Sequence, residues 1–482
     1  MTPSRPQLQI FNSLGRDLVP FEPMAEGVAK IYTCGPTVYN DPHIGNLRTF
    51  VFEDLLRRVL RHLGHEVTQV MNLTDVEDKI IARAIERGVS IDEVTAEPIQ
   101  AFFRDLDLLG VERVEEYPRA TDHIPEMIEM IETLIDKGFA YESDGSVFFR
   151  IAADDDYGRL SGIDLTQVRK GSRVADDEYG KDDARDFVLW KGAKEGEPSW
   201  SSPWGDGRPG WHIECSAMSQ RYLGPSFDIH CGGVDNMFPH HENEIAQSEC
   251  ANGCTFVNYW MHSEHLLVDG AKMSKSLGNQ YTLADLIERG ISVRSVRYLF
   301  LSVHYRHQLN FTFDSVEGAD AALRRFDEMM LRLDRVQASS GAEPVTESLE
   351  RFEHDFSAAL ADDLNTSGAL GAVFALVRDV NRTIDQGLRD DCVEAIRGAF
   401  AAADDVLGVL DASAWEERLS AHGLVPSMSD GLGDDEIEAL LGQRQQARAD
   451  RDFAEADRIR DLLTEAGIVL EDGADGTRWR RS

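Results

Sequence analysis

Residues 28–71 read VAKIYTCGPTVYNDPHIGNLRTFVFEDLLRRVLRHLGHEVTQVM, and their pattern of apolar residues indicates the fold class. Val28–Thr33 is a short, mostly apolar run, which predicts a buried strand. From about 44 to 63, apolar residues recur every three or four positions and Gly64 follows, which predicts an amphipathic helix with a glycine at its end. Glu66–Met71 then predicts a second strand. A strand–helix–strand unit implies a parallel, doubly wound sheet that binds ligands at the carboxyl ends of its strands.

The chain is too long for one domain, because 482 residues exceed the roughly 250–300 that a single hydrophobic core supports. We expect an α/β fold: a doubly wound parallel-sheet (Rossmann-like) catalytic domain with an insertion, followed by a helical bundle and a small C-terminal unit. The expected parts are the first half of the catalytic domain (1–90), the inserted domain (91–190), the second half (191–313), the helical bundle (314–412) and the C-terminal unit (430–482).

The chain is strongly acidic. It has 49 basic and 86 acidic residues, which give a net charge of −37. Such a charge repels itself unless salt screens it, so we interpret it as adaptation to a salt-rich (halophilic) cytoplasm. The sequence contains neither an N-terminal apolar segment nor a stretch of about 20 apolar residues, so we expect a cytoplasmic protein that does not enter a membrane. Six cysteines in a chain of this kind indicate reduced thiols or metal ligands rather than disulfides.

Two short motifs predict a site for the phosphates of ATP. His43 and Gly45 lie where the expected helix begins, and free backbone N–H groups at a helix start favour an anion. The turn KMSKS at 272–276 carries Lys272 and Lys275, in a chain with only nine lysines. Two ammonium groups on one turn can stabilise charge that develops on a reacting phosphate.

A second set of residues predicts a metal site. His240 and Glu244 are four residues apart on an expected helix, so both can reach one ion. Zinc needs about four ligands, and Cys34 and Cys215 are the best distant candidates. Spacing alone does not exclude other ligands, namely Cys231, His241 and the pair Cys250 and Cys254.

At this point the sequence resembles a known family, the cysteinyl-tRNA synthetases of class I. The motifs that carry the resemblance extend over essentially the whole length: Cys34 to Asn46, Asn72 to Asp75, Gly210 to Met218, Phe227 to His230, Phe238 to Glu244, the turn at 272–276, and the C-terminal unit around Ala447, Arg448 and Gly476 to Trp479. The resemblance implies ATP-dependent formation of cysteinyl-adenylate from L-cysteine, followed by transfer to the 3′ end of tRNA(Cys). It also implies one zinc ion per subunit and Mg²⁺ with ATP. We expect a monomer rather than an oligomer.

The resemblance assigns roles to individual residues. The implied zinc ligands are Cys34, Cys215, His240 and Glu244. The implied amino-acid pocket contains Thr74, Trp211 and Asp235. The implied ATP-binding and catalytic residues are His43, Gly45, Asn46, Lys272 and Lys275.

The chain departs from the pattern of the family at one position, and its C-terminal unit separates it from a related ligase. The first signature of the family normally ends in histidine, and here it ends in Asn46, which can donate a hydrogen bond but cannot carry charge.

A cysteine ligase of the mycothiol pathway shares the catalytic domain but lacks the C-terminal unit. That unit has an arginine-rich helical segment (Arg444, Arg448, Arg451, Arg458 and Arg460) and Trp479, which are candidates either for anticodon contact or for a solvated face. A non-catalytic paralogue and a zinc hydrolase fit the motifs less well.

Overall fold

The computed structural model describes residues 6–163, 185–274, 277–336, 345–386, 388–424, 434–449, 453–465, 468–473 and 476–481. The chain divides into two compact units, Met1–Ala412 and Ser413–Ser482. Among the described residues, no helix is both long and apolar enough to cross a membrane.

The centre of the first unit is a parallel sheet with the strand order β10-β9-β3-β4. Its strands are β3 (Val28–Thr33), β4 (Glu66–Met71), β9 (Phe227–Gly233) and β10 (Val257–Ser263). The predicted strands at 28–33 and 66–71 are therefore confirmed, as is the doubly wound parallel fold. The long segment between β4 and β9 places two strands that are distant in sequence, β3 and β9, side by side. Ligands of such sheets bind where the strand order reverses, and here that is the carboxyl edge of β3 and β9.

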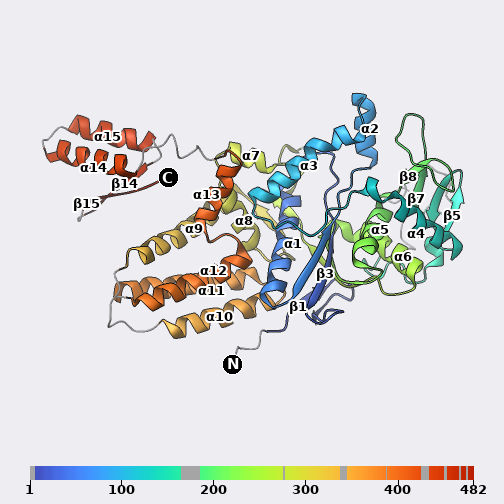
Figure 1. The fold of residues 1–482 in the computed structure, drawn as a ribbon, viewed down its shortest axis with the longest axis horizontal. Helices are drawn as coiled ribbons and strands as arrows, with labels where there is room; N and C mark the ends of the chain where they lie inside the picture. The colour runs from blue at the N-terminus through green and yellow to red at the C-terminus, as the bar shows by residue number, and fades with distance from the viewer. Residues whose placement is uncertain are drawn as a thin grey trace. The chain divides into compact units, whose positions relative to one another are not determined.

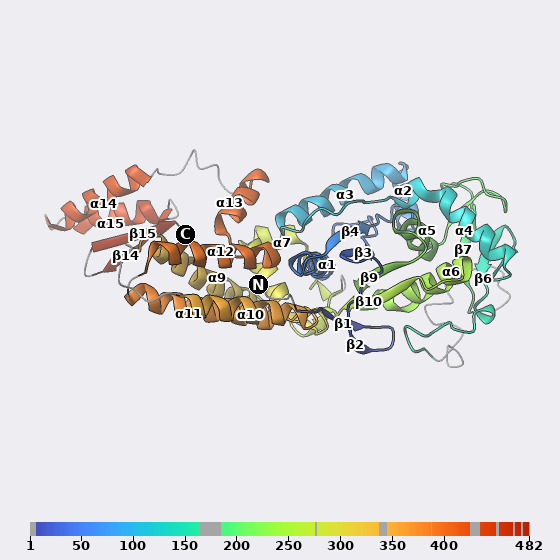
Figure 2. The ribbon, with the colours of Figure 1, turned by 60° about the horizontal axis from the view of Figure 1, so that its bottom comes forward.

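Helices cover both faces of this sheet. Figures 1 and 2 show α1 (Ile44–His62) on one side, and α5 (Trp211–Leu223) and α6 (Glu242–Asn252) on the other. The helix predicted at about 44–63 is confirmed, but the helix is buried on more sides than the apolar face that the sequence predicted. Arg48, Glu53, Asp54 and Arg57 are also buried, because α3 (Ile91–Leu108), α8 (Val293–Ser302) and α12 (Asp390–Leu407) pack against α1.

The helix expected from about Pro239 to Glu249 differs at its start. A short π-helical turn, η5 (Met237–His241), precedes α6, which begins at Glu242. The extended backbone of Phe238 and the following proline, which has no N–H to donate, prevent a regular helix there. His240 therefore lies in the turn and Glu244 in the helix.

A second, antiparallel sheet follows β4 in the chain. It has the order β5-β6-β7-β8 and packs with α4 (Ile124–Asp136). Its strands are β5 (Ala140–Ser143), β6 (Ser146–Phe149), β7 (Phe187–Gly192) and β8 (Gly207–Pro209). The sheet thus continues beyond residue 190. The helix α2 (Asp78–Arg87) leads from the parallel sheet towards α3.

The remaining strands and short helices of the first unit lie around this framework. They are β1 (Gln9–Asn12), β2 (Asp17–Pro20), η1 (Ala120–His123), η2 (Ile151–Ala153), η4 (Val234–Asn236), β11 (Leu266–Val268), β12 (Ala271–Lys272), α7 (Leu283–Glu288) and β13 (Leu309–Phe311). The strand β11 pairs with β12 in antiparallel and with β13 in parallel orientation. This small sheet holds Lys272 at its edge, opposite Leu267.

Four long helices form the bundle of the first unit: α9 (Phe313–Asp334), α10 (Thr346–Ala361), α11 (Thr366–Gln386) and α12. A buried arginine joins this bundle to α1. Arg297 on α8 is fully buried, and its guanidinium donates to Asp54 Oδ2 (2.6 Å) and to the carbonyl oxygens of Leu109 (3.0 Å) and Leu407 (2.9 Å). A buried charge needs such partners, so Arg297 fixes the end of α12 against the helix that carries the first signature.

The second unit has its own small core. Its helices are α14 (Asp434–Ala449) and α15 (Phe453–Glu465), which are followed by an antiparallel pair, β14 (Ile468–Gly473) and β15 (Gly476–Arg481). The helix α13 (Ala412–Ala421) lies at the junction of the units. The core residues are Ile437, Ile459, Leu463 and Ile468, with Trp479 packed against them.

Candidate functional site

Four potential metal ligands from four segments meet at the carboxyl edge of the parallel sheet. Cys34 directly follows β3, Cys215 lies on α5, His240 lies in η5 and Glu244 lies on α6. Their ligand atoms are all within 4.8 Å of one another, and all four residues are buried. Cys34 Sγ is 4.0 Å from Cys215 Sγ and 3.9 Å from Glu244 Oε1, and His240 Nε2 is 3.1 Å from the same carboxylate oxygen. We call these four residues the metal cluster.

Burial disfavours the charged form of every member of the metal cluster. It raises the pKa of Cys34 well above its usual value, and Cys215 and the carboxylate of Glu244 reinforce that shift. For Cys215 the hydrogen bond with Cys34 lowers the pKa, but burial and nearby carboxylates outweigh it. Burial likewise raises the pKa of Glu244 and lowers that of His240. A dication would reverse the preference of the two thiols and the carboxyl group, because it stabilises thiolate and carboxylate, and it would bind the neutral imidazole that burial already favours. The donor set therefore fits a metal ion such as Zn²⁺.

A second set of four side chains overlaps the first. Cys34 and Glu244 are also within 4.8 Å of His230 and His241. His241 was among the candidates from the sequence, whereas His230 was not. His230 lies on β9 between apolar residues, and only the tertiary fold shows that its Nε2 reaches Glu244 Oε2 at 2.9 Å.

The other candidate cysteines are not part of either set. Cys231 is buried, Cys250 is half-buried and Cys254 is exposed. Within the described part of the chain, none of the three joins a group of at least three close metal-ligating atoms.

Two of the three residues implied for the amino-acid pocket, Trp211 and Thr74, have contacts at or next to the metal cluster. The ring of Trp211 stacks on that of His240, with centroids 4.4 Å apart. Thr74 follows β4, and its hydroxyl donates to Glu214 Oε2 at 2.9 Å, one residue before Cys215. Asp235 is exposed in η4, after β9. Glu214 is a residue that the sequence reasoning missed: it is fully buried and orients Thr74.

The first signature forms the N-terminal cap of α1. The backbone N–H of Asn46 donates to His43 Nδ1, and Asn46 Oδ1 accepts from the backbone N–H of His43, both at 3.2 Å. Because Nδ1 accepts a hydrogen bond, the ring proton of neutral His43 lies on Nε2, which can donate to an anion. Burial lowers the pKa of His43, so the neutral form prevails at pH 7.

The two signatures approach each other in the fold. A methyl group added at Gly45 would lie 2.5 Å from Met273 Cε, so glycine allows the lysine turn to lie against the start of α1. The backbone N–H of Ile44 also donates to the carbonyl oxygen of Tyr281 (2.9 Å). Lys272 is on β12, whereas Lys275 lies outside the described residues.

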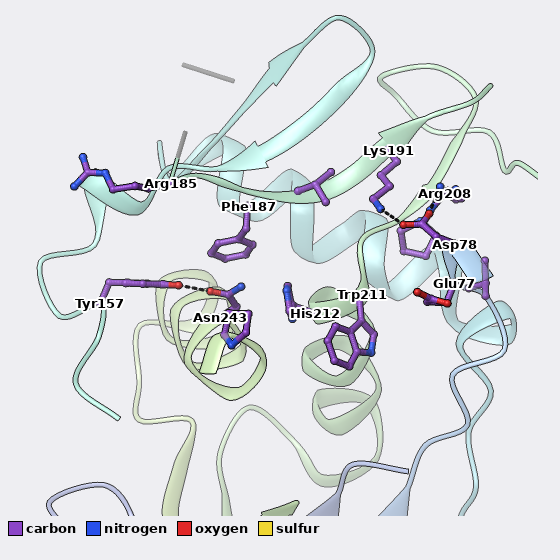
Figure 3. A pocket seen from close by; sticks show the side chains of 14 residues that line it. Glu77, Asp78, Tyr157, Arg185, Phe187, Lys191, Arg208, Trp211, His212 and Asn243 are labelled. Carbon is purple, nitrogen blue, oxygen red and sulfur yellow. Dashed lines mark hydrogen bonds and ion pairs between the residues drawn. The ribbon is translucent and has the colours of Figure 1, made fainter. Parts of the chain in front are cut away.

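A cavity of about 200 Å³ adjoins the metal cluster (Figure 3). Phe187 of β7 points into it from above, and His212 and Asn243 lie on the opposite side, with Trp211 at one edge. His212 Nδ1 is 2.8 Å from His240 Nδ1. The cavity and the cluster thus share a wall.

The arginines of the second unit have unequal surroundings. Arg444 is buried and donates to Thr477 Oγ1 (3.2 Å), whereas Arg448, Arg458 and Arg460 are exposed. Arg451 lies outside the described residues. Trp479 Nε1 donates to Glu438 Oε1 (2.8 Å), which together with its packing gives this side chain a structural role.

Comparison with known families gives matches along the chain. Residues 20–321 match the model of tRNA synthetases class I (C) catalytic domain, 355–411 match the DALR domain, and 430–480 match the cysteinyl-tRNA ligase anticodon binding domain. The chain is 44% identical over 481 residues to the cysteine–tRNA ligase of Protochlamydia amoebophila, covering 98% of each protein. It is 46% identical over 476 residues to that of Solibacter usitatus, covering 98% of this chain and 99% of the relative.

Solved structures share the fold at low sequence identity. The methionyl-tRNA synthetase of Mycobacterium tuberculosis, solved with methionyl-adenylate, aligns with a TM-score of 0.57 at 16% identity, covering 83% of this chain and 94% of that one. The LeuRS of Agrobacterium radiobacter K84, solved with tRNA and LeuAMS, gives a TM-score of 0.58 at 12% identity, covering 85% and 86%.

Proposed function

The chain belongs to the cysteinyl-tRNA synthetase family of class I, and from that premise we propose that it attaches L-cysteine to tRNA(Cys) in two steps that consume ATP. The observation that supports this most directly is the metal cluster, since its four side chains come from four separate segments and meet at the carboxyl edge of the parallel sheet.

In the first step, the carboxylate of cysteine attacks the α-phosphorus of ATP, which gives cysteinyl-adenylate and pyrophosphate. His43 Nε2 and the N-terminus of α1 stabilise phosphate oxygens, and Lys272 and Lys275 neutralise the charge that develops during the attack. In the second step, a hydroxyl of the terminal ribose of tRNA attacks the adenylate carbonyl and releases AMP. Neither step needs a nucleophile from the protein, because positioning and electrostatics are sufficient.

The metal cluster accounts for selectivity. A pocket that distinguished cysteine from serine by shape alone would gain only about 10–200-fold. Zinc held by Cys34, Cys215, His240 and Glu244 would supply a contact that favours a thiolate over a neutral alcohol. These four residues suit zinc better than the overlapping set with His230 and His241, because they offer two sulfur ligands instead of one. His230 then serves as an outer partner that orients Glu244.

Further properties belong to the same proposal. One zinc ion per subunit, Mg²⁺ with ATP, Thr74, Trp211 and Asp235 as contacts of the amino acid, and the division into parts at 90, 190, 313 and 412 remain predictions. So do the monomeric state and a salt-rich cytoplasm as the location, which the net charge of −37 favours.

The proposed function is tested by cysteine-dependent ATP–pyrophosphate exchange with serine as control, followed by a transfer assay. We expect exchange with cysteine, little with serine, and transfer of cysteine to tRNA. Transfer to an amino sugar without charging of tRNA would contradict the proposal and favour the mycothiol-type ligase.

Replacing Asn46 tests the first signature. In Asn46→Asp the carboxylate still accepts from the His43 N–H, but the amide donor is lost and a negative charge faces the phosphates. Losing a hydrogen bond to a charged group costs about 1.5–3 kcal/mol, so kcat/KM for ATP in the exchange assay should fall roughly tenfold or more. Asn46→His, which restores the usual signature of the family, is the control and should stay active. Unchanged kinetics in Asn46→Asp would remove Asn46 from the ATP site.

A further inference from the structure

The cavity of Figure 3 has a cationic edge that the proposed chemistry of cysteine activation does not use. Lys191 of β7 and Arg208 of β8 are largely buried, with side chains only 12% and 6% exposed. Both contact the carboxylate of Asp78, in the first turn of α2, whose side chain is 55% exposed: Lys191 Nζ is 2.9 Å from Asp78 Oδ2, and Arg208 binds Asp78 Oδ1. Arg208 also contacts Glu197 (3.3 Å). We call Lys191 and Arg208 the cationic pair.

The composition of the chain makes this arrangement unusual. A protein with a net charge of −37 and nine lysines places two nearly buried cations side by side, both against the exposed carboxylate of Asp78 from a different element, and one of them also against Glu197. Carboxylate and phosphate present similar pairs of oxygen atoms to such donors. The carboxylate of Asp78 therefore holds a position that a phosphate group could take.

The position of the cavity indicates which phosphate group could bind to the cationic pair. Trp211 and His212 line the cavity and contact His240 of the metal cluster. The second step of the proposed function brings the terminal ribose of tRNA to the adenylate beside this cluster, so the unpaired 3′ nucleotides must pass close by. Unpaired nucleotides are bound by cations along their backbone and by aromatic rings against their bases. Trp211, which is 41% exposed, lines the same cavity as the cationic pair and offers such a ring.

We propose that Lys191 and Arg208 bind a backbone phosphate of the unpaired 3′-terminal nucleotides of tRNA, and that the carboxylate of Asp78 occupies this position until the RNA displaces it. This proposal rests on the proposed function and deepens it, since it names the part of the tRNA that the cavity receives. In the absence of tRNA, Asp78 keeps the two desolvated cations paired. When tRNA binds, the exposed Asp78 side chain turns to solvent.

The competing explanation is a purely structural ion pair that ties α2 to the antiparallel sheet. The two explanations predict opposite effects of Asp78→Asn on the interaction with tRNA. If the contact is structural, Lys191→Met and Asp78→Asn both break it and impair tRNA charging alike. If Asp78 competes with RNA, Lys191→Met weakens tRNA binding and Asp78→Asn strengthens it.

The test measures KM for tRNA in charging, together with cysteine-dependent ATP–pyrophosphate exchange, which requires no tRNA. We expect Lys191→Met to raise KM for tRNA roughly tenfold, and to reduce the slope of log affinity against log salt by about 0.7, the value for one single-strand phosphate contact. Asp78→Asn should lower KM for tRNA several-fold. Exchange should remain unchanged in both variants, which also shows that they are folded. If Lys191→Met fails to fold, Lys191→Gln takes its place.

An exposed ion pair in the same unit provides the control. Arg113 Nη2 and Asp107 Oδ2 are 2.7 Å apart, their side chains are 43% and 39% exposed, and neither residue lines the cavity. Arg113→Met and Asp107→Asn should leave both assays unchanged. A higher KM for tRNA in both Asp78→Asn and Lys191→Met, no change in either, or a rise in KM for ATP instead of tRNA would each overturn the proposal. Absence of exchange in the unaltered protein would instead refute the proposed function.

Discussion

Cys215→Ala is expected to lose bound zinc and cysteine-dependent ATP–pyrophosphate exchange together. Its sulfur is one of only two in the metal cluster and lies 4.0 Å from the other. Loss of a partner that merely supports a ligand typically costs 10–100-fold in metal affinity or activity, so loss of a ligand should reduce exchange by at least about 100-fold. Elemental analysis of the purified protein gives the zinc content, and the exchange assay gives the activity.

The control and the contradicting outcome follow from the geometry. Cys254→Ala removes an exposed thiol outside both sets of ligands and should keep zinc and activity. A metal-free Cys215→Ala protein with full activity would contradict the proposed role of zinc. A Cys215→Ala protein that keeps its zinc would place the ion in the overlapping set, which contains His230 and His241 but not Cys215.

The sequence predicted the parts of the fold that local pattern determines. The strands at 28–33 and 66–71 and the helix after residue 43 have continuous apolar patterns, and the structure has them at the predicted positions. The sequence did not predict that α6 begins only at Glu242. The extended backbone of Phe238 delays the start of the helix, and hydrophobic periodicity does not reveal such a local conformation.

The charged residues inside the first unit could not be predicted either. Asp54 reads as a polar position on α1, yet it is buried because Arg297 reaches it from 243 residues further along the chain. Similarly, the spacing of the cysteines in the sequence does not show which of them are metal ligands. The choice depends on which side chains the sheet brings to one edge, and β3 and β9 become neighbours only in the folded chain.

Removing residues 425–482 is expected to separate the two steps. The first unit keeps the metal cluster, the first signature and Lys272, so exchange should stay within about twofold of the full chain. Charging of tRNA should fall at least about 100-fold in kcat/KM, because each lost base contact is worth about 1–3 kcal/mol and anticodon reading needs several. The measurement is kcat/KM for tRNA beside the exchange rate of the same preparation.

Exposed arginines of the second unit allow a point variant to be compared with the truncation. Arg444 is buried and bonded to Thr477, so its loss would disturb the small core, whereas Arg458 and Arg460 are exposed on α15. The full-length double variant Arg458→Gln/Arg460→Gln should therefore reduce charging while the second unit stays folded. Equal charging by the truncated and full chains would show that the second unit does not read tRNA, and an enzyme that recognises a smaller acceptor would then explain the cysteine-activating site better.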